Sequence, residues 1–186
     1  MEGFAAAERA GFDPIKVNAV IMRGRNDDEI EDFARVTIER PWHVRFIEVM
    51  PVGENLDVSA HEFVSAFEML DRVRAVADLT PVRGPEGNGP ATYFTFAKAR
   101  GTVGVITPMS HNYCERCNRM RLTADGQLRP CLFGELQTNL RDAVRRGEPI
   151  EPLVRETLAI KPERHYLVQG SALGSGGLRA LSQVGG

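Results

Sequence analysis

The sequence predicts an α/β fold: the terminal βα units of an incomplete parallel, TIM-like barrel, followed by an α+β region with antiparallel hairpins. Residues 15–22 and 43–50 are apolar runs typical of strands, and an amphipathic helical pattern separates them. A strand-helix-strand unit pairs its strands in parallel through a right-handed crossover. From residue 91 onward, turn signals between short apolar runs predict antiparallel pairing instead.

Two parallel strands cannot close a barrel or bury themselves on both faces. Either this is the end of a barrel whose earlier units lie outside the sequence, which we favour, or other elements complete the sheet. The expected organisation is a barrel portion at 1–57, a second domain at 58–170 and a flexible, glycine-rich tail at 171–186.

The first elements follow from local patterns. Residues 2–11 are Ala-rich and helical as far as Gly11, and the β-branched run 15–22 suits a strand buried on both faces. Asn26, with Glu29 three residues later, predicts a capping box at the start of the next helix. One apolar stripe then predicts that helix, and it consists of Ile30, Phe33, Ala34, Thr37 and Ile38.

The middle of the chain predicts a helix, a loop and a hairpin. Ser59 with Glu62 forms a second capping-box pattern, and we expect the helix to run to about Arg72. Its apolar face would carry Phe63, Phe67 and Leu70. Six Gly and Pro residues make 78–90 a loop by composition. The strands expected at 91–97 and 102–107 would pair as an antiparallel hairpin, and two more helices are expected near 139–146 and 149–159.

Composition restricts the class of protein. The net charge of −2 argues against a general polyanion binder, and no apolar run is long enough for a membrane span. The amino terminus has no signal-peptide pattern, so we expect a cytoplasmic protein with no membrane partner. Three cysteines, an odd number, fit a metal or redox role in a reducing compartment better than a disulfide framework.

The most informative segment contains these cysteines, at Cys114, Cys117 and Cys131. Cys114 and Cys117 lie in a C-x-x-C pattern, which can direct two sulfurs at one metal ion or cluster. Residues 124–126 suit a three-residue hairpin loop with Gly126 in the left-handed conformation. This loop would bring Cys131 back toward the first pair.

The same register would place four side chains on one face. It pairs Cys131 with Arg119 and Arg129 with Arg121, whereas a two-residue loop would turn Cys131 to the other face. Opposed arginines repel unless an anion lies between them, and guanidinium groups bind phosphates bidentately. A polyphosphate ligand is therefore the favoured interpretation, and a solvated strand face is the alternative.

The cysteine spacing leaves the metal open. Structural zinc needs four ligands, and His111 could be the fourth. An iron-sulfur cluster on three thiolates would leave one iron open to an outside ligand. Buried cysteines with no ligand are a third, weaker possibility.

The segment CxxCNRxRLTxDGxLRPCLF resembles the carboxy-terminal half of the GTP 3',8-cyclase family, radical S-adenosylmethionine lyases of molybdenum cofactor (molybdopterin) biosynthesis. The resemblance extends over the chain through DPIKVNAVIMRGRNDDEI, RFIEVMPVGE and the terminal SQVGG. It implies that 58–170 is a GTP-binding domain with a second [4Fe-4S] cluster. It also implies roles for individual residues: cluster ligation by Cys114, Cys117 and Cys131, GTP binding by Lys16, Arg119 and Arg121, S-adenosylmethionine contact by Met50, and an active-site tail ending in Gly185 and Gly186.

Met50, at the carboxyl end of an expected parallel strand, agrees with where α/β barrels bind ligands, and Lys16, at the start of its strand, does not. In that family, GTP becomes 3',8-cyclo-7,8-dihydroguanosine 5'-triphosphate, which the cyclic pyranopterin monophosphate synthase then consumes. The sequence departs from the family in having no CxxxCxxC motif. We therefore expect a fragment or one half of a split protein. S-adenosylmethionine and the first [4Fe-4S] cluster would require the missing amino-terminal half, and the fragment alone would be inactive.

Two rival interpretations remain. A zinc-stabilised module could bind a nucleotide or nucleic acid through its arginines, but of the aromatic residues only Tyr113 is close to them, so no nucleic acid is expected. The Gly185-Gly186 ending could instead be a sulfur-carrier tail, although such carriers need no cysteine cluster.

Overall fold

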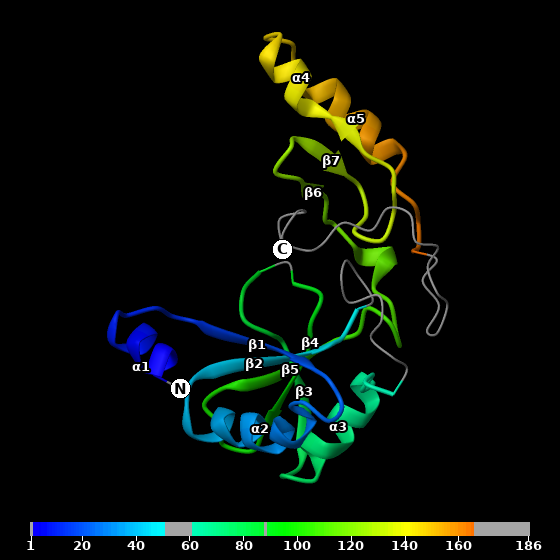
Figure 1. Ribbon diagram of the computed structural model, residues 1–186. Helices are drawn as coiled ribbons and strands as arrows, with labels where there is room; N and C mark the ends of the chain where they lie inside the picture. Colours follow the sequence, from blue (N-terminus) through cyan, green and yellow to red (C-terminus); the bar gives the residue numbers. More distant parts are fainter. Residues whose placement is uncertain (1, 51–60, 88, 166–186) are drawn as a thin grey trace. The chain divides into compact units, whose positions relative to one another are not determined.

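The computed structural model of the chain describes residues 2–50, 61–87 and 89–165, and these form two compact units (Figure 1). The first unit comprises residues 2–49 and 61–112, and the second comprises residue 50 and residues 113–165. The domain limits expected from the sequence stay a prediction. Among the described residues, no helix is both long and apolar enough to cross a bilayer.

The first unit is built on a five-stranded mixed sheet. In spatial order its strands are β1 (Ile15–Ile21), β2 (Trp42–Glu48), β5 (Thr102–Ile106), β4 (Thr92–Phe96) and β3 (Leu79–Val82). The first three are mutually parallel, and β4 runs antiparallel to both β5 and β3. The expected parallel pair and the expected hairpin are confirmed, and the TIM-like barrel stays a prediction.

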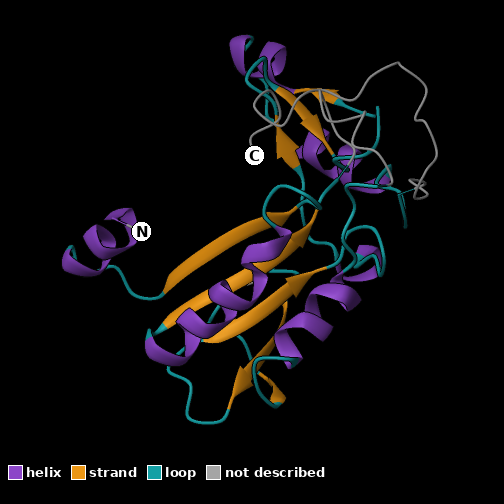
Figure 2. Ribbon diagram, turned by 60° about the horizontal axis from the view of Figure 1, so that its bottom comes forward, coloured by secondary structure: helices purple, strands orange, loops and turns teal. Residues whose placement is uncertain are grey.

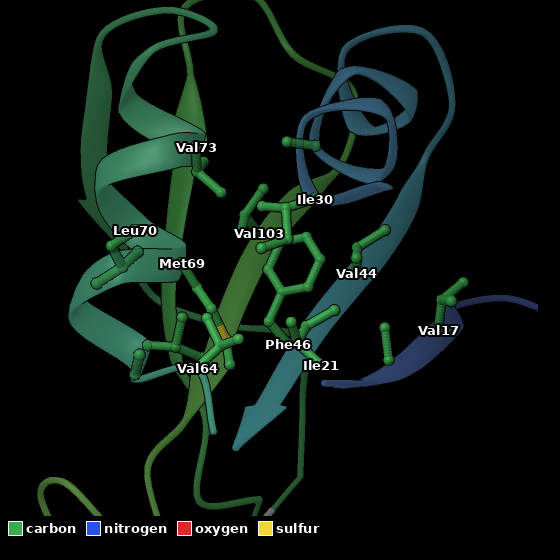
Figure 3. Close-up of a cluster of buried hydrophobic side chains, with 14 of the residues drawn as sticks. Val17, Ile21, Ile30, Val44, Phe46, Val64, Met69, Leu70, Val73 and Val103 are labelled. Carbon is green, nitrogen blue, oxygen red and sulfur yellow. The ribbon is translucent and has the colours of Figure 1, made fainter. Parts of the chain in front are cut away.

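Helices cover one face of this sheet. After α1 (Glu2–Arg9), the helices α2 (Ile30–Glu39) and α3 (Ala66–Arg74) lie side by side on the same face (Figures 1 and 2). A 3-10 turn, η1 (Asp27–Glu29), leads into α2. Between the helices and the sheet, apolar side chains such as Phe46, Met69 and Val103 form the core (Figure 3).

The capping box expected at Asn26 and Glu29 is wrong, because the Asn26 side chain turns back toward β1. Its Oδ1 accepts from the Met22 N–H at 2.9 Å, and its Nδ2 donates to the Val20 carbonyl at 2.9 Å. Asn26 makes no side-chain cap on η1. It therefore closes the turn that follows β1.

The helix expected from Ser59 begins later. Ser59 lies outside the described residues, and the N-cap is Ser65, whose hydroxyl accepts from the Glu68 N–H at 3.2 Å. Phe63 precedes the helix and forms an isolated bridge, while Phe67 is 64% exposed. Of the three expected apolar positions, only Leu70 is buried; the others that face the core are Ala66, Met69 and Val73.

Two further expectations about the sheet are wrong. Strand β1 is buried on one face only: Val17, Ala19 and Ile21 point into the core, whereas Val20 is 44% exposed. The segment 78–90 contains strand β3, although Gly and Pro made it look like a loop. Pairing with β4 holds it in the sheet, and this tertiary partner is invisible to local composition.

The second unit is small. Its sheet is antiparallel in the order β6-β7-β8, and both expected helices are present. Its elements are η3 (Cys114–Arg116), β6 (Arg121–Leu122), β7 (Gln127–Arg129), β8 (Thr138–Asn139), α4 (Leu140–Arg145) and α5 (Glu151–Ala159).

A buried carboxylate joins three segments of the first unit. Glu48, the last residue of β2, is 0% exposed. Its Oε1 accepts from the Ala66 N–H at 2.9 Å and from the Ser110 hydroxyl. Its Oε2 accepts from the N–H groups of Met109 and Ser110, both at 2.9 Å. The carboxylate thus connects the end of β2, the start of α3 and the segment after β5.

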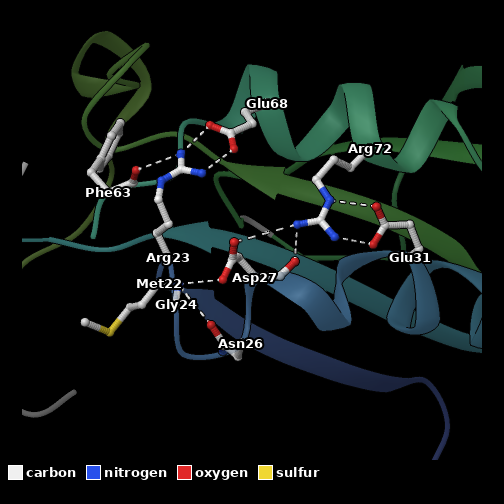
Figure 4. Close-up of polar contacts among 9 residues, drawn as sticks. All are labelled: Met22, Arg23, Gly24, Asn26, Asp27, Glu31, Phe63, Glu68 and Arg72. Carbon is white, nitrogen blue, oxygen red and sulfur yellow. Dashed lines mark hydrogen bonds and ion pairs between the residues drawn. The ribbon is translucent and has the colours of Figure 1, made fainter. Parts of the chain in front are cut away.

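An arginine on α3 holds the two covering helices together. Arg72 donates to both carboxylate oxygens of Glu31 on α2, at 2.6 and 2.5 Å, and also to the Asp27 carbonyl (Figure 4). The hydrogen bonds from Arg72 lower the pKa of Glu31 below its ordinary value. Nearby, Arg23 and Glu68 form a more exposed pair at 2.6 Å.

We predict that Glu48→Gln lowers the free energy of unfolding by about 2–3 kcal/mol, because the amide presents a donor where the buried site needs an acceptor. Urea unfolding followed by fluorescence of Trp42, the single tryptophan, measures this in the first unit. The control is Glu68→Gln, whose pair with Arg23 is 38–44% exposed and screened by water, so its loss should have a much smaller effect. Equal losses would contradict a special role for Glu48.

We predict that Arg72→Met costs about 1–2 kcal/mol at pH 7, since the pair with Glu31 is bidentate and less than one third exposed. Because the folded pKa of Glu31 is lowered, this contribution is present above the ordinary value of 4.5 and disappears as the pH falls through the lowered value. Unfolding curves from pH 7 to pH 3 test this. Arg74→Met, which removes an exposed pair with Asp71 on the same helix, should show almost no effect, and a pH-independent Arg72→Met loss would be evidence against the assignment.

Candidate functional site

The hairpin that follows the first cysteine pair has the predicted register. Arg121 pairs with Arg129 and Leu122 with Leu128. Gly126 has a φ of +81°, and its N–H donates to the Thr123 carbonyl at 2.9 Å. The three-residue loop at 124–126 is therefore confirmed.

The register does not extend as far as expected. Strand β6 begins at Arg121 and β7 ends at Arg129, so neither Arg119 nor Cys131 belongs to a strand. The sequence is one reason for this early end, since Pro130 has no N–H to continue the ladder. Arg119 and Cys131 therefore do not form the expected strand pair.

Arg129 differs from its expected role. It is only 2% exposed, and its Nη2 donates to the Gly134 carbonyl. Its guanidinium therefore holds the turn that follows Cys131. This burial excludes a solvated strand face for Arg129, while its pairing with Arg121 is the expected one. Its strand partner Arg121 is half-buried.

The first two cysteines lie on one short turn. Cys114 opens η3, and the Cys117 N–H donates to the Cys114 carbonyl at 3.0 Å. All three cysteines are half-buried and free of disulfides. Within the described ranges, no three His, Cys, Asp or Glu side chains gather in a geometry that could hold a metal ion, so the shared site stays a prediction. By its chemistry alone, the donor set of three reduced thiols on one unit suits an iron-sulfur cluster.

A lysine that the sequence analysis missed lies beside this turn. Lys161 follows α5, and its Nζ is 3.7 Å from the Cys117 Sγ and 2.5 Å from the Arg119 carbonyl oxygen. A cation beside one sulfur suits an anionic thiolate ligand. No local pattern could have identified it, because Lys161 is 44 residues from Cys117 in the chain.

Arg119 also contacts an aromatic side chain. Its guanidinium carbon lies 5.7 Å from the centroid of the Tyr113 ring, within the range of a cation–π interaction. Burial raises the pKa of the Tyr113 phenol above its ordinary value, so the ring remains neutral near pH 7. Arg119 is thus held at its side chain by Tyr113 and at its backbone carbonyl by Lys161.

Of the remaining predicted site residues, the structure describes Lys16 and Met50. Lys16 is in the first unit, on β1, where its Nζ donates to the Glu86 carbonyl at 3.0 Å. Met50 is half-buried and follows β2 by two residues. Gly185 and Gly186 lie outside the described residues.

Comparison with known proteins identifies the class to which this arrangement belongs. The family model for Molybdenum Cofactor Synthesis C matches residues 42–167. Proteins named GTP 3',8-cyclase are similar over the whole chain: that of Pelotomaculum thermopropionicum is 45% identical over 189 residues, and that of Moorella thermoacetica is 44% identical over 188. The protein of the same name from a Nostoc species is 46% identical over 191 residues.

The chain belongs to the Molybdenum Cofactor Synthesis C family. It spans 57% of the length of each of these three relatives, while they cover 100% of the chain. The resemblance to the carboxy-terminal part of GTP 3',8-cyclase is thereby confirmed.

We predict that Gly126→Ala destabilises the hairpin, because a Cβ there would lie 2.5 Å from the Arg141 Cβ in addition to the strain of a positive φ. The control is Gly147→Ala, at a φ of +70° with no atom within 4 Å of the added Cβ. Strain alone should cost about 1–2 kcal/mol at Gly147, and the clash should add to it at Gly126. Amide hydrogen exchange at Thr123 and Gln127 measures the difference, and equal protection in both variants would contradict it.

Proposed function

We propose that this chain is the substrate-binding portion of a GTP 3',8-cyclase, which converts GTP to 3',8-cyclo-7,8-dihydroguanosine 5'-triphosphate at the start of molybdenum cofactor biosynthesis. The observation that carries the proposal is the cysteine turn and its hairpin, formed in the predicted register. Relatives that are 44–46% identical over the whole chain bear the name of this enzyme.

In this proposal the second unit holds the purine and the phosphates. Cys114, Cys117 and Cys131 would ligate a [4Fe-4S] cluster, which when bound supplies an open iron as a Lewis acid for the guanine. Arg119 and Arg121 would bind phosphate oxygens, as planar guanidinium groups do. The contact of Arg119 with Tyr113 supports this role, because it restricts the guanidinium before the ligand arrives.

The rest of the proposed machinery involves the first unit and sequence beyond this chain. Lys16 would contact GTP, and Met50 would lie against S-adenosylmethionine at the carboxyl end of a barrel strand. Radical formation needs a first cluster that is bound by a CxxxCxxC motif. This sequence does not contain that motif. We therefore propose that the chain alone binds GTP without turning it over.

The same proposal covers the tail and the cellular setting. Gly185 and Gly186 would enter the active site, because residues without side chains can occupy a space too narrow for any other residue. The enzyme would act in the cytoplasm, and its product would pass to the cyclic pyranopterin monophosphate synthase.

We predict that the chain, purified without oxygen, contains about four irons and four acid-labile sulfides. Calorimetry should then show GTP binding that Arg119→Ala and Arg121→Ala each weaken by about 1.5–3 kcal/mol, or roughly 10–150-fold. Arg155→Ala is the control, because Arg155 pairs on the surface of α5 with Glu151.

Two outcomes would contradict the proposal at different points. Stoichiometric zinc without sulfide would favour a zinc-stabilised module over the cluster. Unchanged GTP affinity in a cluster-loaded Arg119→Ala/Arg121→Ala variant would show that neither arginine binds the nucleotide.

A further inference from the structure

Lys161 is the one described lysine whose ammonium contacts both a predicted cluster ligand and a predicted phosphate-binding residue. Its Nζ lies 3.7 Å from the Cys117 sulfur and 2.5 Å from the Arg119 carbonyl oxygen. An ammonium group has three donors and no acceptor, so both contacts must be donated by Lys161. One side chain thus spans the backbone between Cys117 and Arg119.

The position of Lys161 is fixed by the helix that precedes it. Its N–H donates to the Leu158 carbonyl at 3.1 Å, which closes the end of α5. One turn earlier, Thr157 is 0% exposed, and its hydroxyl bonds to the Thr138 hydroxyl on β8 at 2.7 Å. Helix α5 is therefore anchored on the sheet of the second unit, and Lys161 extends from this anchor to the cysteine turn.

Lys161 differs from Arg164 and Arg119, two other cations near the turn, in its partners and in its exposure to water. Arg164 also reaches this turn, but it pairs with Glu115 at 3.0 Å, and both side chains are more than 60% exposed. The Arg119 guanidinium lies over Tyr113. Lys161 is half-buried, so its charge acts on the Cys117 sulfur with less screening by water than the charge of Arg164.

Hydrogen bonds to ligand sulfurs and nearby positive charge set the reduction potential of an iron-sulfur cluster, because they stabilise the more electron-rich reduced state. We infer that Lys161 is a positioning residue that fixes the turn from Cys117 to Arg119 and raises the reduction potential of the cluster by donating a hydrogen bond to the Cys117 sulfur. This inference rests on the proposed function, since it requires the cluster.

The test uses the whole chain, purified without oxygen and carrying its cluster, in a redox titration followed by electron paramagnetic resonance. Lys161→Met removes the charge and the donor at similar length and should shift the midpoint to a more negative potential. A tenfold fall in the reduced-to-oxidised ratio at a fixed applied potential corresponds to about 59 mV for a one-electron couple, and this is the expected size. Lys161→Arg keeps a charged donor and should restore the wild-type potential.

Arg164→Gln is the matched control, because it removes a positive charge from the same turn without touching a sulfur, and its potential should equal that of the wild type. GTP affinity gives a second measurement: Lys161→Met should weaken binding severalfold by releasing the Arg119 backbone, and Lys161→Arg should restore it. A structural role alone would lower thermal stability without this pattern of loss and rescue.

The outcomes separate this inference from the proposed function. A wild-type chain without a cluster overturns the proposed function and this inference together. A wild-type cluster whose potential is the same in Lys161→Met overturns the inference alone. Lys161→Met could also fold but lose its cluster. In that case, retention of the cluster in Lys161→Arg supports the inference. Loss of the cluster in both variants assigns Lys161 a packing role and overturns the inference.

Discussion

The first unit depends on one buried carboxylate. Glu48 is fully enclosed, and an ion in that position is destabilising by several kcal/mol unless its oxygens are hydrogen-bonded. Three backbone N–H groups and the Ser110 hydroxyl supply those bonds, and they come from the start of α3 and from the segment after β5. Because the bonds converge at the carboxyl end of β2, they fix the edge of the sheet where α/β proteins place their ligands. Three residues after Ser110, the chain enters the turn that carries Cys114.

The elements that the sequence predicted correctly are those defined by local periodicity. The apolar runs of β1 and β2 and the stripe on α2 each satisfy one repeat within one segment. Details that depend on a distant partner were wrong or absent. Strand β3 contains Pro81 and is recognisable only beside β4, and Asn26 bonds to the strand before it in preference to the helix after it. In the sequence, Glu48 cannot be distinguished from an ordinary strand residue, because the groups that enclose it come from α3 and residue 110.

The same distinction holds at the candidate site. The hairpin register followed from loop length and from Gly126, both of which are local, and the pairing of Arg121 with Arg129 confirms it. The sequence could not show that these two arginines have unequal surroundings. Arg129 is buried and donates to the Gly134 carbonyl, whereas Arg121 is half-buried. Lys161 was missed because only the packing of α5 brings it to Cys117.

The second unit has a physical reason to bind a cluster beyond its chemistry. Its strands are two or three residues long, and the buried apolar side chains among its described residues are Leu128, Leu140 and Ala143. These three described side chains contribute little stability by themselves, and domains with few buried apolar side chains commonly rely on a metal for the remainder. Binding to a site that exists only in the folded state adds its free energy to folding. A cluster on Cys114, Cys117 and Cys131 would join the turn of η3 to the segment after β7, which Arg129 already holds through Gly134. Under the proposed function, the groups that bind the substrate would therefore also stabilise the unit that presents them.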